Sequence, residues 1–97
     1  MIVHIVVFKF KDENKEANIK KAKVMLDDLE KKIPALVSME VGVNFDTAER
    51  AFDLSVYSKF KTKEDLDTYA VHEEHLKAVE FIKSVVNESK VVDYILD

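Results

Sequence analysis

The sequence has no cysteine and no tryptophan, and it has only one glycine and one proline among 97 residues. The lack of cysteine excludes a disulfide framework, a thiolate metal site and a cysteine nucleophile. A glycine-rich loop that cradles phosphate cannot be built from Gly42 alone. Because no segment is rich in glycine, in proline or in a repeated motif, we expect residues 1–97 to form a single domain.

Basic residues are outnumbered by acidic residues, 15 to 19, and the net charge is −4. Nucleic acids and anionic membranes need a concentrated basic surface, so neither is expected as a partner. The apolar start, residues 2–10, includes His4 and Lys9. It is far shorter than the ~20 residues that span a bilayer, and it is too short for a secretory signal. With the lack of cysteine, this predicts a cytoplasmic protein.

What the chain does have is regular apolar patterning. Residues 2–10 are apolar on both faces, which predicts a strand that is covered on both sides. Helical spacing predicts a helix over residues 14–33 that Pro34 ends, and alternation predicts strands over residues 37–45 and 52–60. A capping pattern at Thr62 and Asp65 opens a helical region, and residues 91–96 return to strand. The inner positions expected in the helical region are Leu66, Tyr69 and Ala70, then Leu76, Val79, Ile82, Val85 and Val86.

This order of elements, β-α-β-β-α-β, predicts an α+β protein with a ferredoxin-like antiparallel sheet and helices on one face. The other face then lacks a cover, and the central first strand places Val3, Ile5 and Val7 on one of its two faces. Burying three such side chains stabilises by about 5–9 kcal/mol per chain, against an association cost of about 4–15 kcal/mol per dimer. A homodimer through this open sheet face is therefore favoured.

The two neighbouring histidines, His72 and His75, suggest a metal site at first sight. The sequence His72-Glu73-Glu74-His75 is one residue shorter than a zinc-protease motif. Two zinc-binding histidines on a helix need a spacing of four residues to aim both rings at one point, and the spacing here is three. We therefore predict no metal.

Acid–base chemistry is the stronger candidate. A histidine exchanges a proton near neutral pH, and a tyrosine hydroxyl can hold a carbonyl or enolate oxygen beside it. His4 shares a strand face with Val6 and Phe8, and Tyr69 shares a helix face with His72. Each residue alone is ordinary: His4 and Tyr69 as core residues, His72 and His75 as solvated residues at a helix end. Only their combination indicates a site.

The chain resembles the stress-responsive A/B barrel (Dabb) family over essentially its whole length. No single stretch is specific, but the combination is. The matching residues are Met1–Lys11, Ile33-Pro34, Val41–Asn44, Asp53-Leu54, Tyr57–Phe60, Tyr69, His72, His75-Leu76, Val79, Phe81–Lys83, Val85-Val86 and Val92–Tyr94.

This resemblance implies a dimeric α+β barrel in which two sheets face each other. A plant polyketide (olivetolic acid) cyclase is more distantly similar, and it closes its substrate by aldol condensation without cofactor or metal. The resemblance to the cyclase implies that His75 is a general base, Tyr69 its positioning partner, and His4 a third member of the catalytic group. It also implies that His72, Phe8 and Val56 line the ligand pocket.

The sequence departs from the family pattern at one point, because Glu73 replaces the proline of His-Pro-x-His. Proline favours the first position of a helix, so its loss allows one helix to continue through this segment. In a continuous helix, Tyr69 and His75 would point in different directions. Phe8 is also bulky enough to fill a cavity that a smaller side chain would leave open.

Two functions of different classes remain open. One is a stress-associated dimer without catalysis that binds a small apolar ligand between sheet and helices. The other is a cofactor-free enzyme of cyclase or related proton-transfer type, with His75 as base. A cofactor-free monooxygenase is a further alternative, since that activity also occurs on dimeric α+β barrels.

Overall fold

The computed structural model describes residues 1–97 and contains four strands and three helices. In chain order they are β1 (Ile2–Phe10), α1 (Lys15–Lys32), β2 (Ser38–Val43), β3 (Leu54–Phe60), α2 (Lys63–Ala70), α3 (Glu73–Val85) and β4 (Val86–Ile95). This is the predicted β-α-β-β-α-β order, with the second helical region divided into α2 and α3. No helix combines the length and the hydropathy needed to cross a membrane.

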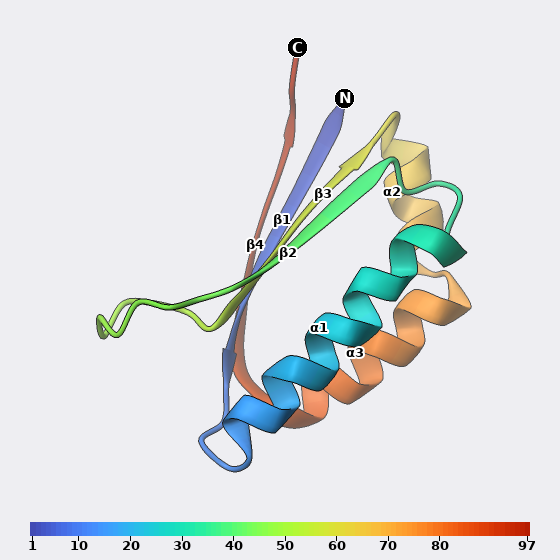
Figure 1. Ribbon diagram of the computed structural model, residues 1–97. Coiled ribbons are helices and arrows are strands. Elements are labelled where there is room, and N and C mark those ends of the chain that lie inside the picture. The colour runs from blue at the N-terminus through green and yellow to red at the C-terminus, as the bar shows by residue number, and fades with distance from the viewer.

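The strands form one antiparallel sheet in the order β2-β3-β1-β4. The central position of β1, between β3 and β4, was predicted from the sequence. All three helices lie on the same side of the sheet (Figure 1). The ferredoxin-like α+β fold is therefore confirmed, and the opposite sheet face has no cover within one chain.

The hydrophobic core lies between the sheet and the helices. On β3 the side chains of Leu54, Val56, Ser58 and Phe60 are buried, while the residues between them are only partly buried. Leucines from α1 and Ile82 from α3 pack against this layer. Each fully buried large apolar side chain stabilises the fold by about 1.5–3 kcal/mol. This packing fixes the helices over one face of the sheet.

Two residues that the helical pattern assigned to the interior are exposed. Ala70 is exposed at the end of α2, and Leu76 is 51% exposed on α3. The cause is a break between the two helices, which changes the phase of the apolar stripe. Val86 packs against the core as expected, but it is the first residue of β4 and not part of the helix, because α3 passes directly into that strand. The predicted start at residue 91 was too late because residues 87–90 are polar, as suits an exposed edge strand.

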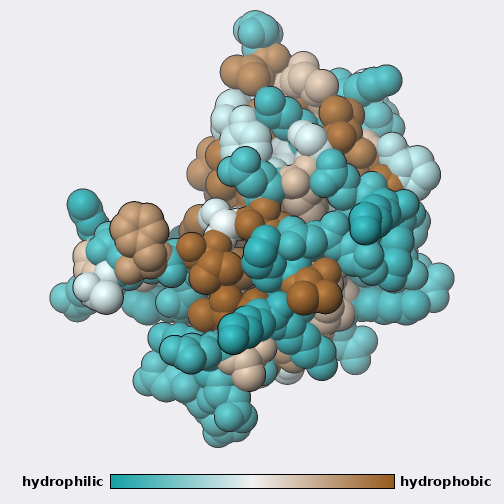
Figure 2. Space-filling model, in the orientation of Figure 1, coloured by the Kyte–Doolittle hydropathy of each residue, from teal (hydrophilic) through white to brown (hydrophobic).

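The strands predicted over residues 37–45 and 52–60 are shorter in the structure. Residues 44–53 form an arm between β2 and β3 that projects away from the helices (Figure 1). Figure 2 shows this arm standing clear of the body and carrying a hydrophobic side chain. Phe45, which the alternation placed in a half-buried strand, lies on the arm and is 98% exposed.

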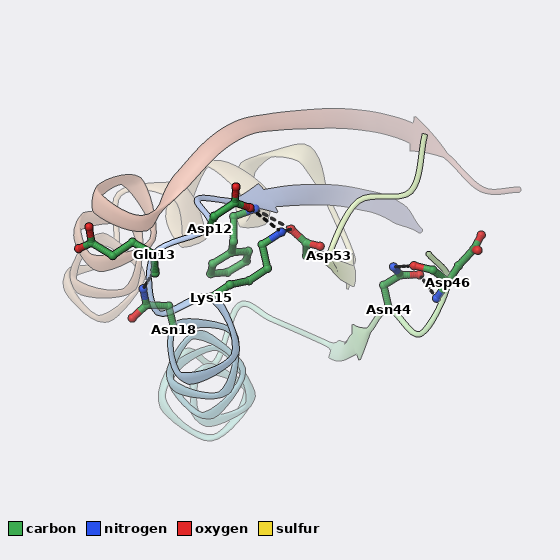
Figure 3. A network of polar contacts seen from close by, with 8 residues as sticks. Asp12, Glu13, Lys15, Asn18, Asn44, Asp46 and Asp53 are labelled. Carbon is green, nitrogen blue, oxygen red and sulfur yellow. Dashed lines mark hydrogen bonds and ion pairs between the residues drawn. The ribbon is translucent and has the colours of Figure 1, made fainter. Parts of the chain in front are cut away.

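Polar contacts brace the arm (Figure 3). The Asn44 side-chain amide donates to the carbonyl of Asp46 at 2.7 Å, and the Asn44 side-chain oxygen accepts from the amide of Asp46 at 3.0 Å. At the base of the arm, the carboxylate of Asp53 accepts from the amide of Phe10 at 2.8 Å and lies 3.9 Å from Lys15 Nζ. Such side-chain-to-backbone bonds favour a defined turn over a random loop.

The open sheet face differs from the prediction at Val3. The side chains of Ile5 and Val7 are partly exposed there, but Val3 is 0% exposed even within one chain. In the strand register it lies between Lys59 and Tyr94, which share this face. Val3 therefore has no surface left to bury against a partner.

Candidate functional site

A cavity of about 220 Å³ lies between the sheet and the two C-terminal helices. Its walls come from β1, β3 and β4 on one side and from the helices on the other. The lining is mainly apolar, with a few polar groups, as ligand sites usually are. The twelve lining residues are His4, Val6, Phe8, Leu26, Val56, Tyr69, His75, Val79, Ile82, Lys83, Val86 and Ser89.

His75 and Tyr69 form one edge of the cavity. Their ring centroids are 4.3 Å apart, and the planes are tilted by 42°. Nδ1 of His75 is 3.0 Å from the carbonyl oxygen of Ala70. A carbonyl only accepts hydrogen bonds, so Nδ1 carries the hydrogen and Nε2 of the neutral ring keeps its lone pair. This is the tautomer that a general base in the cavity requires.

His4 reaches the same edge from β1, with its ring centroid 6.5 Å from that of Tyr69. Its Nδ1 bonds to the carboxylate of Asp93, the residue directly opposite on β4. The carboxylate accepts, so Nδ1 donates and Nε2 is left as the free nitrogen. From β3, the buried hydroxyl of Ser58 donates to the carbonyl of His4 at 3.0 Å and fixes the backbone beneath the ring.

Three polar atoms of this cluster have no partner within the protein: the Tyr69 hydroxyl and Nε2 of both His4 and His75. No side-chain nitrogen or oxygen in the chain is both fully buried and unpaired. These three atoms are therefore accessible to water or to a ligand. Since all three residues line the cavity, their free polar atoms can meet one small molecule.

Burial determines the protonation states of His75 and Tyr69. Desolvation lowers the pKa of His75, and the nearby His4 and His72 lower it further, while the bond to the carbonyl of Ala70 works in the opposite direction. Burial also raises the pKa of the Tyr69 hydroxyl well above its ordinary value. At neutral pH the cluster thus presents a neutral imidazole as acceptor and a protonated phenol as donor.

The helical region does not continue as one helix, although the loss of the proline would allow it. The chain turns at Val71, and α3 begins at Glu73 with His72 as its N-cap. Nδ1 of His72 accepts from the amide of Glu74 at 3.1 Å, so the imidazole does the capping work of an Asn or Ser. This break turns α3 relative to α2 and brings His75 back against Tyr69. The prediction that His72 lines the ligand pocket was wrong, because its ring is held in the cap and it is not among the lining residues.

The structure places Phe8 and Val56 in the cavity wall, and Phe8 does not fill the space. Sequence patterns gave no role to Asp93, the partner of His4. A carboxylate between Val92 and Tyr94 in an apolar strand could have drawn attention to Asp93. The strand register that sets it opposite His4, however, cannot be predicted from the sequence. No three side chains of His, Cys, Asp or Glu are grouped so that they could hold a metal ion.

A family model described as Stress responsive A/B Barrel Domain matches residues 2–96. A stress-response A/B barrel domain-containing protein of Arabidopsis thaliana is 30% identical over 105 residues. The match covers 100% of this chain and 37% of the plant protein. The chain therefore spans little more than a third of the length of this relative.

Solved structures agree on the fold. A dimeric protein of unknown function and ferredoxin-like fold from Bacteroides fragilis is 30% identical, with a TM-score of 0.90 over 98% of this chain and 95% of that chain. A hydroxynitrile lyase from Passiflora edulis is 19% identical, with a TM-score of 0.86 over 99% and 93% of the two chains. An antibiotic biosynthesis monooxygenase is 15% identical, with a TM-score of 0.80 over 100% and 99%. At these identities the two enzymes support the fold alone.

The His72 cap gives a first prediction. His72→Ala should lower the free energy of unfolding by about 1 kcal/mol, because the amide of Glu74 loses its acceptor, whereas His72→Asn should retain most of the stability. Urea denaturation of the three proteins measures the difference. Equal losses for Ala and Asn would show that the cap contributes nothing.

The environment of His75 gives a second prediction. Its NMR resonances should titrate at a lower pH than those of a free histidine, whose pKa is about 6.5. Because the unfolded chain takes up this proton at a higher pH than the folded chain, stability should fall as the pH drops below about 6.5 towards the folded pKa. His75→Phe should flatten this part of the profile. A titration midpoint at or above the ordinary value would contradict the assigned burial.

Proposed function

The chain belongs to the stress-responsive A/B barrel family, and from this membership we propose that it works as a homodimer that binds a small, mainly apolar carbonyl compound. The ligand occupies the cavity between sheet and helices. We further propose that His75 moves a proton on this ligand, with Tyr69 and His4 beside it. The observation that carries the proposal is that three neighbouring residues, each with a polar atom that has no partner in the protein, line one mainly apolar cavity.

The open sheet face supports the homodimer. Ile5 and Val7 are partly exposed there, and the register sets Val92 directly beside Ile5 on the same face. Val92 is 60% exposed and Tyr94 39% exposed. Each large apolar side chain that a second chain buries fully would stabilise the pair by about 1.5–3 kcal/mol. A second sheet laid against this face provides that cover, and the relative from Bacteroides fragilis is dimeric.

The arm supports the same arrangement. Phe45 is 98% exposed on a loop that hydrogen bonds hold in place, so its side chain contributes no burial energy within its own chain. The arm projects away from the helices, beyond the uncovered side of the sheet (Figure 1). A second chain against the open face would lie within its reach, and Phe45 would then pack against the partner.

Size and polarity define the ligand of the cavity. The cavity volume of about 220 Å³ lies below the range of about 300–1,000 Å³ that is usual for drug-sized ligands, so the ligand is small. Most of the wall is apolar, which favours an alkyl or aryl body. The Tyr69 hydroxyl donates to an oxygen, which calls for a carbonyl at that end.

Proton transfer follows from this pose. Nε2 of neutral His75 accepts a proton from the carbon beside the carbonyl, and the electrons of the broken C–H bond move onto the carbonyl oxygen. The Tyr69 hydroxyl donates a hydrogen bond to the enolate that forms, and the phenol stays protonated because its pKa is raised. If the proton on His75 Nε2 exchanges with solvent before it returns to the carbanion, the result is isotope exchange. If the carbanion instead attacks a second carbonyl, the alkoxide that forms takes the proton from His75 Nε2, which completes an aldol addition and restores the neutral imidazole. Asp93 keeps His4 in the tautomer with a free Nε2.

A substitution on the open face tests the dimer. Ile5→Lys should give monomers or aggregates, because a charge would enter a dry interface. Val24→Lys is the matched control, since Val24 is 69% exposed on α1 on the helical side of the sheet. Sedimentation velocity distinguishes the two. An intact dimer with Ile5→Lys would place the interface elsewhere.

Exchange of α-protons tests the chemistry. In D₂O the protein should speed deuterium incorporation into methyl ketones with short alkyl tails, as followed by NMR. His75→Gln should lower the catalysed rate by about a hundredfold or more, the usual contribution of a general base. Lys31→Gln, an exposed change on α1, should leave it unchanged. Ligand binding without any catalysed exchange would favour the non-catalytic dimer, and a product that gains an oxygen atom would favour the monooxygenase alternative.

A further inference from the structure

The cavity has a second polar end that the proposed chemistry does not use. Lys83 and Ser89 line it, and neither belongs to the cluster of His4, Tyr69 and His75. Lys83 is the only formally charged residue among the twelve that form the lining, and no aspartate or glutamate is among them. Although the whole chain has a net charge of −4, the cavity lining has one positive and no negative side chain, so the cavity favours anionic ligands.

The distance between the two ends follows from the two walls. On α3, His75 and Lys83 are eight residues apart, which is about 12 Å at 1.5 Å per residue. On the sheet, His4 pairs with Asp93 and Phe8 with Ser89, so the two pairs are four residues apart, or about 13 Å. The segment of α3 and the segment of the sheet run side by side, and both give a length of about 12–13 Å between the two ends of the cavity. The cavity is therefore elongated, with polar groups at its ends and apolar side chains between.

Lys83 is free to receive a ligand. Each of the nine ion pairs in the chain leaves it out. Glu80, one turn earlier on α3, is not part of the lining, and Glu88 pairs with Lys90 at 3.2 Å. Lys83 is exposed at the rim, so its ammonium group stays hydrated until a ligand arrives. The Ser89 hydroxyl adds a neutral donor from the opposite wall.

We propose that the ligand is a medium-chain oxo-carboxylic acid, with its carboxylate at Lys83 and Ser89 and its carbonyl at Tyr69 and His75. The alkyl chain between them packs on the apolar middle of the cavity, formed by residues such as Val6, Phe8 and Val79. This inference rests on the proposed function, because it needs the carbonyl end to be in place. It adds the charge of the substrate class and its approximate length.

The test compares an acid with its neutral analogue. Calorimetry should show that the wild-type protein binds 7-oxooctanoate about three- to fivefold more tightly than 7-oxooctanamide, as expected for one rim-exposed ion pair. Lys83→Gln should abolish this preference, and Lys83→Arg should retain it. Lys77→Gln, on the same helix but outside the cavity, should leave it unchanged. The preference should also shrink as the salt concentration rises.

Two further readouts separate the possible failures. Both probes should shift the NMR resonances of His75 if they occupy the cavity. Equal affinities for acid and amide, with His75 shifted by both, would overturn the role of Lys83 and leave the proposed function standing. If neither probe shifts His75, cavity binding itself fails, and both proposals fall. The shorter 4-oxopentanoate should show no dependence on Lys83, because it cannot reach both ends, and a dependence would overturn the inferred length.

Discussion

The pairing of β4 with β1 is the interaction on which the rest of the molecule depends. It sets Asp93 opposite His4, Ser89 opposite Phe8, and Val92 beside Ile5. A slip of one residue would turn every side chain of β4 to the other face. Asp93 would then leave His4, and a valine would leave the open sheet face. The polar cluster, the far end of the cavity and the exposed apolar face are therefore fixed by one set of backbone hydrogen bonds.

The break between α2 and α3 is the second constraint, and it determines the direction of the His75 ring. Residues six apart on one continuous helix lie on different faces, because each residue turns the helix by about 100°. The chain instead bends at Val71, and His72 caps the new helix. His75 then stacks near Tyr69 while its Nδ1 is held by the carbonyl of Ala70. The glutamate at position 73 is compatible with the break because a side-chain cap replaces the proline.

Sequence patterns recovered the parts of this protein that rest on local periodicity. The strand at residues 2–10, the helix ended by Pro34 and the cap at Thr62 are all present. The parts that failed depend on relations between distant segments. Asp93 and Val92 gain their meaning only from the register with β1, and the start of β4 was hidden by exposed polar residues. The exposure of Phe45 could not be predicted, since a phenylalanine in an alternating segment normally indicates a strand.

The two faces of β1 link the dimer to the cavity. Ile5 and Val7 point to the open face, whereas His4 and Val6, which alternate with them along the strand, point into the cavity. A partner that covers the open face would therefore also restrain the strand that carries His4. The effect should be greatest on β4, an edge strand whose residues from Asn87 onward are all exposed in one chain. Edge strands that lack packing open most readily, so in the proposed dimer the position of Asp93 would depend on the cover that the second chain gives to Val92 and Tyr94.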